Sequence, residues 1–496
     1  MAQGLIRVFN STDTRKLQRK VGVSATRVKQ VIFKPMTATL NPYLADNFAP
    51  VKTELTVDEL PVLGELPPEL NGMFVRNGPN PQFPPLSRYH WFDGDGMLHS
   101  VHIQGGKASY RNRYIRTQGF ERERQAGRAL FGGLLELSQG GFKNVANTAI
   151  VWHRNRLLAL WEGGEPHAIA VPSLDTLGSH TFSGKLNSPV TAHPKIDPVT
   201  GEMMFFGYSL AQPPYVRYSL VSADGELLRT VPIDLPVGVM MHDFAITEHY
   251  TIFMDLPLTF RTERLQRGEP AFAFERDRPS RFGILPRHGD NQTIHWFEAS
   301  SCYVFHTLNA YEAGDSIVLI ACRMGSTSVL GASPGSHEGD NRQVGNDVPL
   351  LYRWQFNLKT GIVQEQTLDD RPCEFPRINE QYLGRQTHYG YAGSSAPTEL
   401  PKFDGLLKFN LDQQSVQMHS FGRRRYGGEG VFVPRPGATM EDDGWLMTFV
   451  HDEIQDTSEL VIISTQAMTD EAIARILMPQ RIPYGFHGTW VSFPYC

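Results

Sequence analysis

The sequence predicts an all-β protein, most simply a β-propeller, from three observations. Short segments with alternating apolar residues follow one another from about residue 60, and Asp-Gly, Thr-Gly or Gly-Asp pairs close many of them. Glycine tolerates the positive φ angles of tight turns, so these pairs between β-branched runs indicate antiparallel hairpins. Glycine and proline are plentiful, at 45 and 34 residues, and no long helical pattern interrupts the hairpins. Hairpins that recur through several hundred residues favour a propeller over separate sandwiches.

The predicted elements can be placed along the chain by these turn signals. Hairpin turns are expected at residues 196–203, 222–227, 312–318, 357–362 and 442–447. Longer inserted loops are expected at residues 258–285, 330–350 and 377–400. Two segments, 128–137 and 468–477, have helical patterns. The first puts Leu130, Leu134 and Leu137 on one side of the helix. On a propeller, helical and loop inserts would gather on one face and cap the axis. Segment 128–137 would either pack on the propeller or form an apolar lip that dips into lipid.

Composition and charge narrow the class of protein. The 496 residues are 41% hydrophobic, and their formal charge of −5 gives no sign of nucleic-acid binding. No apolar run reaches the length of a membrane span, and the first residues lack the apolar core of a secretory signal. The four cysteines contain no Cys-x-x-Cys pair. We therefore expect a cytoplasmic protein that is soluble or lies peripherally on a membrane.

The first 40 residues differ from the rest in charge. They hold eight lysines and arginines against one acid, Asp13, together with apolar residues such as Phe9 and Phe33. A basic, partly apolar segment is attracted to an anionic bilayer by about 1 kcal/mol per cation near the surface. The sequence thus predicts a basic amphipathic segment at residues 1–50 and a propeller domain at residues 51–496. The alternative is a disordered or loosely docked segment that binds no membrane.

Four of the 17 histidines each end a hydrophobic or aromatic run. They are His193, His242, His306 and His487. A buried imidazole must hydrogen-bond or bind a metal, because an unpaired buried polar group costs about 1–3 kcal/mol. The separations of 49, 64 and 181 residues exclude a site on one helix but fit the inner strands of different blades. Four imidazoles that converge on the axis would suit Zn, Cu, Fe or Ni. The alternative for each is a core histidine with ordinary partners.

A site made only of neutral histidines leaves the charge of a divalent ion uncompensated, so acidic residues should hold the outer ring nitrogens. Three glutamates stand in apolar or glycine-rich surroundings, Glu162, Glu374 and Glu429. Taken singly, each is equally a salt-bridge or turn residue. Together with the histidines they indicate one metal centre.

At this point the sequence resembles the carotenoid cleavage oxygenases. The shared motifs run in order along nearly the whole chain after residue 50, at Asn71–Pro81, Phe92–Met97, Leu158–Gly164, Ala192–Pro194, His242–Phe244, Cys373–Pro376, Phe432–Gly437 and His487–Trp490. The family consists of seven-bladed propellers in which four histidines hold Fe(II) on the axis and three glutamates support three of them. The resemblance therefore implies seven blades, with the inserts forming a cap over the metal.

The resemblance also assigns roles to residues. It implies that His193, His242, His306 and His487 bind Fe(II) and that Glu162, Glu374 and Glu429 support them, with no further catalytic group. Thr148 matches a family residue whose methyl group crowds an open coordination position. Trp161, Phe305 and Phe375 flank these residues and are expected to line a tunnel that grips the substrate; the alternative is that they are ordinary core aromatics.

The implied activity is cleavage of a conjugated double bond of a carotenoid or apocarotenoid by O2, giving aldehyde or ketone products. The segments Gly78–Pro81 and Tyr89–Met97 are more similar to members that cut at the 9,10 and 9',10' bonds than to those that cut apocarotenoids at 15,15' and release retinal. A stilbene-cleaving member and an isomerase-type relative are alternatives. A propeller that only binds a ligand is a remote one.

Overall fold

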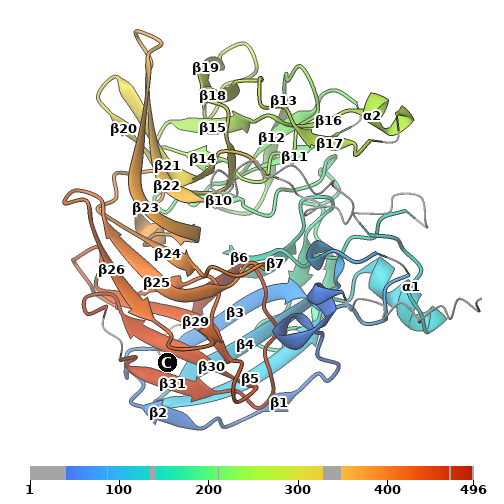
Figure 1. Cartoon of the computed structure of the whole chain (residues 1–496), viewed down its shortest axis with the longest axis vertical. Helices are drawn as coiled ribbons and strands as arrows, with labels where there is room; N and C mark the ends of the chain where they lie inside the picture. Colours follow the sequence, from blue (N-terminus) through green and yellow to red (C-terminus); the bar gives the residue numbers. More distant parts are fainter. Residues whose placement is uncertain are drawn as a thin grey trace, which may run out of the picture. The chain divides into compact units, whose positions relative to one another are not determined.

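Nearly all regular structure in the protein is β-strand, as the sequence predicts (Figure 1). The computed structural model describes residues 41–86, 88–133, 141–210, 212–267, 269–327, 348–468 and 471–493. Within these ranges, helices are confined to α1 (Gln118–Ala126), α2 (Thr262–Gln266) and short 3-10 turns at Pro42–Leu44, Asp46–Phe48, Trp91–Asp93 and Glu380–Tyr382.

In the described residues the strands form eight antiparallel sheets if the long strand β23 is counted in two of them; one is a two-stranded hairpin, and the other seven are here called blades 1 to 7. Each blade is given from its inner edge strand outward. Blade 1 contains β32 (Gly488–Ser492), β3 (Gly72–Pro79), β4 (Gly96–Gln104), β5 (Lys107–Tyr114) and β1 (Thr56–Val57). Blade 2 contains β6 (Ala149–His153), β7 (Arg156–Leu160), β8 (His167–Ile169) and β9 (Thr176–Ser179). Blade 3 contains β10 (Lys195–Ile196), β11 (Met203–Tyr208), β12 (Val216–Val221) and β13 (Leu227–Ile233).

The remaining blades follow in chain order. Blade 4 contains β14 (Ala245–Ile246), β15 (Tyr250–Asp255), β18 (Ser280–Pro286) and β19 (His295–Ala299). Blade 5 contains β20 (Tyr303–Ala313), β21 (Ser316–Met324), β22 (Leu350–Asn357) and the first part of β23 (Val363–Arg377). Blade 6 contains the second part of β23, β24 (Tyr389–Ser395), β25 (Phe403–Asn410) and β26 (Ser415–Ser420). Blade 7 contains β28 (Val431–Pro434) and β27 (Arg425–Tyr426), then β29 (Gly444–Asp452), β30 (Thr457–Ser464), β31 (Ala474–Leu477) and β2 (Val62–Gly64).

Two strand exchanges join the last blade to the first. Strand β2, which lies between β1 and β3 of blade 1 in the sequence, adds to the outer edge of blade 7, where Val62 pairs with Ile476. Strand β32, from after blade 7, adds to the inner edge of blade 1, where Gly72 pairs with Ser492. Figure 1 accordingly shows β29 and β30 beside β3 and β4. The ring of blades is thus closed by segments from far apart in the sequence.

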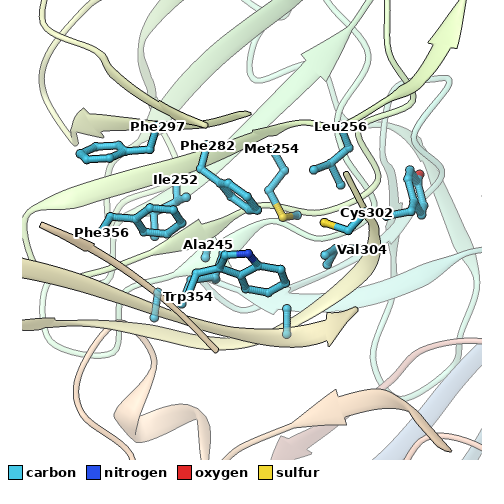
Figure 2. Close-up of a cluster of buried hydrophobic side chains, with 14 of the residues drawn as sticks. Ala245, Ile252, Met254, Leu256, Phe282, Phe297, Cys302, Val304, Trp354 and Phe356 are labelled. Atoms are coloured by element: carbon cyan, nitrogen blue, oxygen red, sulfur yellow. The ribbon is translucent and has the colours of Figure 1, made fainter. Parts of the chain in front are cut away.

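The blades are held together by apolar side chains on both faces. In β15, Ile252 and Met254 point toward blade 5, whereas Phe253 points toward blade 3. Successive side chains of a strand alternate between faces, so a sheet that is covered on both sides needs a continuous apolar run. Figure 2 shows the first of these contacts, where β15 and β18 of blade 4 face the fully buried Trp354 on β22.

Some sequence-based predictions of local structure were wrong. Segment 128–133 is not helical, because helix α1 ends just before it at Gly127, which has φ +66°; residues 134–137 lie outside the described ranges. In segment 468–477, residues 474–477 form strand β31, in which buried Ala474 and Ile476 alternate and pair with β30. The expected loop at 377–400 contains strand β24.

The predicted insert at 258–285 exists as a β16 (Leu258–Phe260) and β17 (Phe272–Phe274) hairpin that encloses α2. Most of the insert predicted at 330–350 lies outside the described residues, as do residues 1–40. Membrane association of the basic segment therefore stays a prediction. Among the described residues, no helix combines the length and apolar character needed to cross a bilayer.

Candidate metal centre

One notable residue lies on the inner edge strand of each of the seven blades or up to three residues before it. From blade 1 to blade 7 these residues are His487, Thr148, His193, His242, His306, Glu374 and Glu429. All four predicted ligands, two of the three glutamates and Thr148 thus occupy corresponding positions. Their irregular spacing in the sequence reflects the different lengths of the blades between them.

The four histidines converge, as the sequence predicts. One ligand nitrogen from each lies within 4.8 Å of those of the others. Their ring centroids are 4.5 to 5.1 Å apart in every pair for which a ring contact exists. The closest approach joins Nε2 of His193 and Nε2 of His242 at 3.0 Å. These are the only four residues in the described ranges that form such a group of metal-ligand side chains.

Each of the three predicted glutamates accepts a hydrogen bond from one histidine. Nδ1 of His242 donates to Glu162 at 2.6 Å, and Nδ1 of His306 donates to Glu374 at the same distance. Nδ1 of His487 lies 2.9 Å from Glu429. A carboxylate can only accept, so the proton is on Nδ1 and the lone pair of Nε2 is left for a metal.

The glutamates are themselves held by partners that the sequence did not reveal. The hydroxyl of Tyr208 donates to Glu162 at 2.8 Å. The backbone N–H of Gly488 donates to Glu429 at 2.8 Å, and Nη1 of Arg377 lies 3.3 Å from the same carboxylate. Arg377 is near Glu374 in the sequence, but nothing in the sequence links it or Tyr208 to a partner on another blade.

Burial and the local charges set the protonation of these groups. Burial lowers the pKa of His487 to about 4, although Glu429 opposes the shift. Burial and the neighbouring imidazoles hold the pKa of His193 well below its usual value. Burial would raise the pKa of Glu429, but Arg377 and His487 lower it to about 2. Neutral imidazoles beside ionised carboxylates are the state in which metal ligands bind.

The field of the carboxylates is strong enough to reverse the effect of burial at one histidine. Burial alone would lower the pKa of His242, but the Glu162 carboxylate, with Asp243 and Glu374, raises it above its ordinary value. Burial and the same Glu162 charge keep the pKa of Tyr208 well above its usual value, so its hydroxyl stays a donor. The cluster is therefore a site that attracts a cation.

Two features of the cluster fit a bound metal. Nε2 of His306 is buried and has no hydrogen-bond partner, which would cost about 1–3 kcal/mol unless a metal takes the lone pair. Two nitrogens that bind one ion at right angles, each at about 2.1 Å, lie about 3.0 Å apart, which is the separation between His193 and His242.

Aromatic rings lie against the histidines. Phe305 is 5.5 Å from the ring of His242, and Phe375 is 5.3 and 5.1 Å from those of His306 and His487. Phe375 belongs to a buried group that we call the aromatic cluster, made of Phe48, Trp91, Phe375, Phe403, Tyr484 and Phe486. Sequence analysis missed the other five residues. Phe486 could have been found, because it precedes His487 as Phe305 precedes His306.

Thr148 and Trp161 lie near the four histidines, as their backbone contacts and sequence neighbours show. The carbonyl of Thr148 accepts from the N–H of His487 at 3.2 Å, and its hydroxyl donates to the side-chain carbonyl of Asn147. Trp161 precedes Glu162, and its ring lies 2.4 Å from where a β-carbon on Gly163 would be. Glycine is therefore required at 163 for the ring to keep this position. The roles of both residues toward a ligand stay predictions.

A cavity of about 240 Å³ adjoins His193, His306 and His487. It is lined by residues that follow the histidines and glutamates along the inner strands, among them Lys195, Asp243, Thr307, Arg377 and Trp490. Phe305, Phe375 and Phe486 are not in its lining. The four-histidine site thus borders both a group of aromatic rings and a cavity with polar and apolar walls.

Known proteins share this chain's sequence and fold. A family model described as retinal pigment epithelial membrane protein matches residues 48–492. A carotenoid 9,10(9',10')-cleavage dioxygenase of Pisum sativum is 42% identical, over 91% of this chain and 90% of the relative. A carotenoid cleavage oxygenase of Mycobacterium tuberculosis is 36% identical, over 91% and 97%.

Solved structures with a similar fold point to the same family. A lignostilbene dioxygenase of Pseudomonas brassicacearum superposes with a TM-score of 0.85 at 32% identity, over 92% of this chain and 99% of that one. The cobalt-substituted Synechocystis apocarotenoid oxygenase gives 0.79 at 32% identity, over 90% and 97%. With the seven blades and the four-histidine site, these matches show that the chain belongs to the carotenoid cleavage oxygenase family, whose fold is the β-propeller.

Proposed function

We propose that the protein is a carotenoid cleavage dioxygenase that holds Fe(II) on His193, His242, His306 and His487 and cuts the 9,10 and 9',10' double bonds of a carotenoid. The observation that carries the proposal is the convergence of four Nε2 atoms, three of them with Nδ1 bound to a glutamate. Four imidazole ligands suit iron, and the glutamates supply the negative charge that a divalent ion needs.

Iron(II) would supply the activation of dioxygen, and the side chains would supply position. Glu162, Glu374 and Glu429 hold three imidazoles in fixed orientations, so the ligand nitrogens need no rearrangement when the ion binds. No acid or base is required of the protein. Its contribution is to fix one double bond at the reactive position, which can supply a large part of the rate enhancement.

The aromatic rings beside the centre suit a polyene. Phe305 and Phe375 contact the histidine rings. Phe375 also contacts Phe403 of the aromatic cluster, and in the same cluster Phe486 contacts Trp91. Flat apolar rings bind a rigid conjugated chain by contact and keep water from the reacting bond. We propose that Phe305, Phe375 and Trp161 line this substrate path and that the methyl group of Thr148 limits access to one open metal position.

The choice of substrate rests on the relatives. Dioxygenases named for 9,10(9',10') cleavage, from Pisum sativum and Phaseolus vulgaris, are 42% and 40% identical to this chain, against 32% for the lignostilbene enzyme. The lignostilbene dioxygenase nevertheless superposes on this chain with a TM-score of 0.85. A phenolic stilbene is therefore the alternative substrate to test.

The test is product analysis with purified, iron-loaded protein under air. Incubation with β-carotene should release a ring-bearing ketone from each end and a central dialdehyde, detected by chromatography and mass spectrometry. Parallel incubations contain a β-apocarotenal and a phenolic stilbene. Retinal formed only from the apocarotenal would replace the proposed substrate by an apocarotenoid, and cleavage of the stilbene alone would replace it by a stilbene.

Two histidine variants distinguish loss of the metal site from a general loss of folding. His306→Ala should lose both bound iron and turnover. His451→Ala removes another buried histidine, which bonds to Ser458 outside the cluster, and should keep its iron. Wild-type protein that binds no iron in an anaerobic titration would overturn the enzyme proposal in favour of a propeller that only binds ligands.

We also propose that the basic residues 1–40 attract the protein to membranes, where carotenoids are dissolved. The charge of the segment supports this proposal. Co-sedimentation with anionic vesicles should weaken sharply when the segment is deleted and when salt is raised. Equal binding of the deleted protein to the vesicles would contradict it.

A further inference from the structure

Asp243, which follows His242, is a buried carboxylate with four close partners. It is 1% exposed. Oδ1 lies 2.7 Å from Nζ of Lys195 and accepts from the N–H of Phe244 at 2.8 Å. Oδ2 accepts from both the N–H and the hydroxyl of Thr307, each at 2.8 Å. A carboxylate taken out of water needs such partners, because an unpaired buried charge costs several kcal/mol.

The partners come from the strands that carry three of the histidines. Lys195 is two residues after His193, and Thr307 directly follows His306. Asp243 therefore joins the inner edge strands of blades 3, 4 and 5, each within two residues of a histidine. Nζ of Lys195 also lies 3.4 Å from the hydroxyl of Thr307, which closes a triangle of contacts. We call Lys195, Asp243 and Thr307 the strand clamp.

The clamp holds an irregular part of strand β20. The pairing of β20 with β21 shifts register between Val304 and Thr307 and again between Thr307 and Asn309. His306 lies within this bulge. A bulge re-aims a side chain, but its extra residue is not fixed by the regular ladder. The N–H of Thr307 instead donates across to Asp243 on the next blade, so the conformation that turns His306 inward depends on that carboxylate.

We propose that the strand clamp is a positioning device for the metal centre: Asp243 sets the spacing of His193, His242 and His306 and fixes the bulge that aims His306. The glutamates orient single rings, whereas the clamp fixes the three backbones relative to one another. This inference rests on the proposed metal site. It assigns Asp243 no contact with substrate or metal.

The test measures metal binding rather than turnover. Metal-stripped wild type, Asp243→Asn, Lys195→Met and Thr307→Val are titrated anaerobically with Co(II), and the visible absorption of the bound ion reports its coordination geometry. Asn keeps the size of Asp but loses the ion pair and presents N–H groups to Lys195 or Thr307. We expect Asp243→Asn to lose about 10- to 100-fold in affinity, with an altered spectrum, as for other groups that hold metal ligands.

Two matched controls isolate positioning from stability. Asp255→Asn removes an equally buried carboxylate that pairs with Arg278 and Arg281 on blade 4, so it should lower the unfolding midpoint and leave Co(II) affinity and spectrum as in wild type. Thr307→Ser keeps the hydroxyl, so it should bind Co(II) as wild type does, whereas Thr307→Val should bind more weakly.

The outcomes are distinguishable. Wild type that binds no Co(II) would refute the proposed metal site itself. Wild type and Asp243→Asn that bind Co(II) with equal affinity and equal spectra would refute the clamp and leave the metal site standing. If Asp243→Asn does not fold, the comparison of Thr307→Val with Thr307→Ser decides the matter, and equal binding by these two variants also refutes the clamp.

Discussion

Phe375 combines a ring against the metal centre with a backbone conformation that suits glycine. Its φ is +55°, in the left-handed region, and its N–H donates to Glu374 at 2.5 Å. The left-handed conformation costs a residue with a β-carbon about 1 kcal/mol or more. The protein keeps a phenylalanine there, which is understandable if the ring serves the ligand path.

We predict that Phe375→Gly is more stable than Phe375→Ala. Both remove the ring, but only glycine removes the left-handed strain, so the difference in unfolding free energy should be about 1 kcal/mol in favour of glycine. Denaturant unfolding curves measure it, and both variants should lose carotenoid turnover alike. A Phe375→Ala protein that equals or exceeds Phe375→Gly in stability would show that the strain is absent.

The bond from Tyr208 to Glu162 predicts a graded series of metal affinities. Tyr208→Phe removes one donor from the partly buried Glu162 carboxylate, at a cost of about 1.5–3 kcal/mol shared between stability and metal binding. Glu162→Gln should weaken Co(II) binding by about 10- to 100-fold, and Tyr208→Phe by less. Tyr110→Phe is the control, since that buried hydroxyl bonds to His99 and Gln480 instead. The order of affinities in Co(II) titrations checks the prediction.

At the scale of residues, the sequence predicts which side chains form the site better than it predicts their hydrogen-bond partners. The four histidines and Glu162, Glu374 and Glu429 could be found because each is a polar residue at the end of an apolar or glycine-rich run. Tyr208 and Arg377 could not be linked to them, because hydrogen bonds between blades depend on which strands become neighbours. Phe48 joins the aromatic cluster from a segment far from any motif.

Among the elements, the pairing of β3 with β32 has no room for a side chain at Gly72. A β-carbon on Gly72 would meet the carbonyl of Val491 at 2.4 Å and the ring of Trp490 at 2.5 Å. Gly72→Ala would therefore push the end of β32 at Val491 and Ser492 away from β3. His487 precedes the other end of this five-residue strand, so we expect the displacement to reach it through β32.

We predict that Gly72→Ala lowers both stability, by about 1–3 kcal/mol, and metal affinity. Gly405→Ala introduces the same kind of clash, 2.4 Å from the carbonyl of His419, but within blade 6 between β25 and β26. It should lower stability to a similar extent and leave Co(II) affinity unchanged. Equal loss of affinity in both variants would mean that general loosening, and not displacement of β32, weakens the site.

Elements with strong turn signals were predictable, and short ones were not. Hairpins such as β12–β13 follow from the Asp-Gly pairs between their strands. The apolar residues near 474 fit a helical period as well as a strand. They are extended because β31 pairs with β30 on one side and with β2 on the other. Helix α1 was missed because most of its side chains are polar, with only Phe120 and Glu123 buried.

For the whole molecule, a metal ion bound by the four histidines would connect separate blades. The four histidines come from blades 1, 3, 4 and 5, so a bound ion would tie four separate sheets at the axis. A ligand that binds only the folded state stabilises it by about 2.7 kcal/mol at a free concentration 100 times its Kd.

We predict that removing the metal lowers the thermal unfolding midpoint by several degrees and that adding Fe(II) back without oxygen restores it. Differential scanning of chelator-treated and reloaded protein measures the shift. The His306→Ala variant serves as the control, because chelator and Fe(II) should leave its midpoint where it was. A wild-type midpoint that ignores both treatments would mean that the ion does not bridge the blades.

The closure of the ring by β32 has a consequence for biosynthesis. A chain grows from blade 1 toward blade 7, so His193, His242 and His306 leave the ribosome early, while His487 appears only after the whole of blade 7 has been made. Its strand must then find β3, in a contact of very large sequence separation, which is a slow kind of folding step. A nascent chain thus offers at most three of the four imidazoles. The complete four-histidine site therefore forms only after translation has passed residue 487.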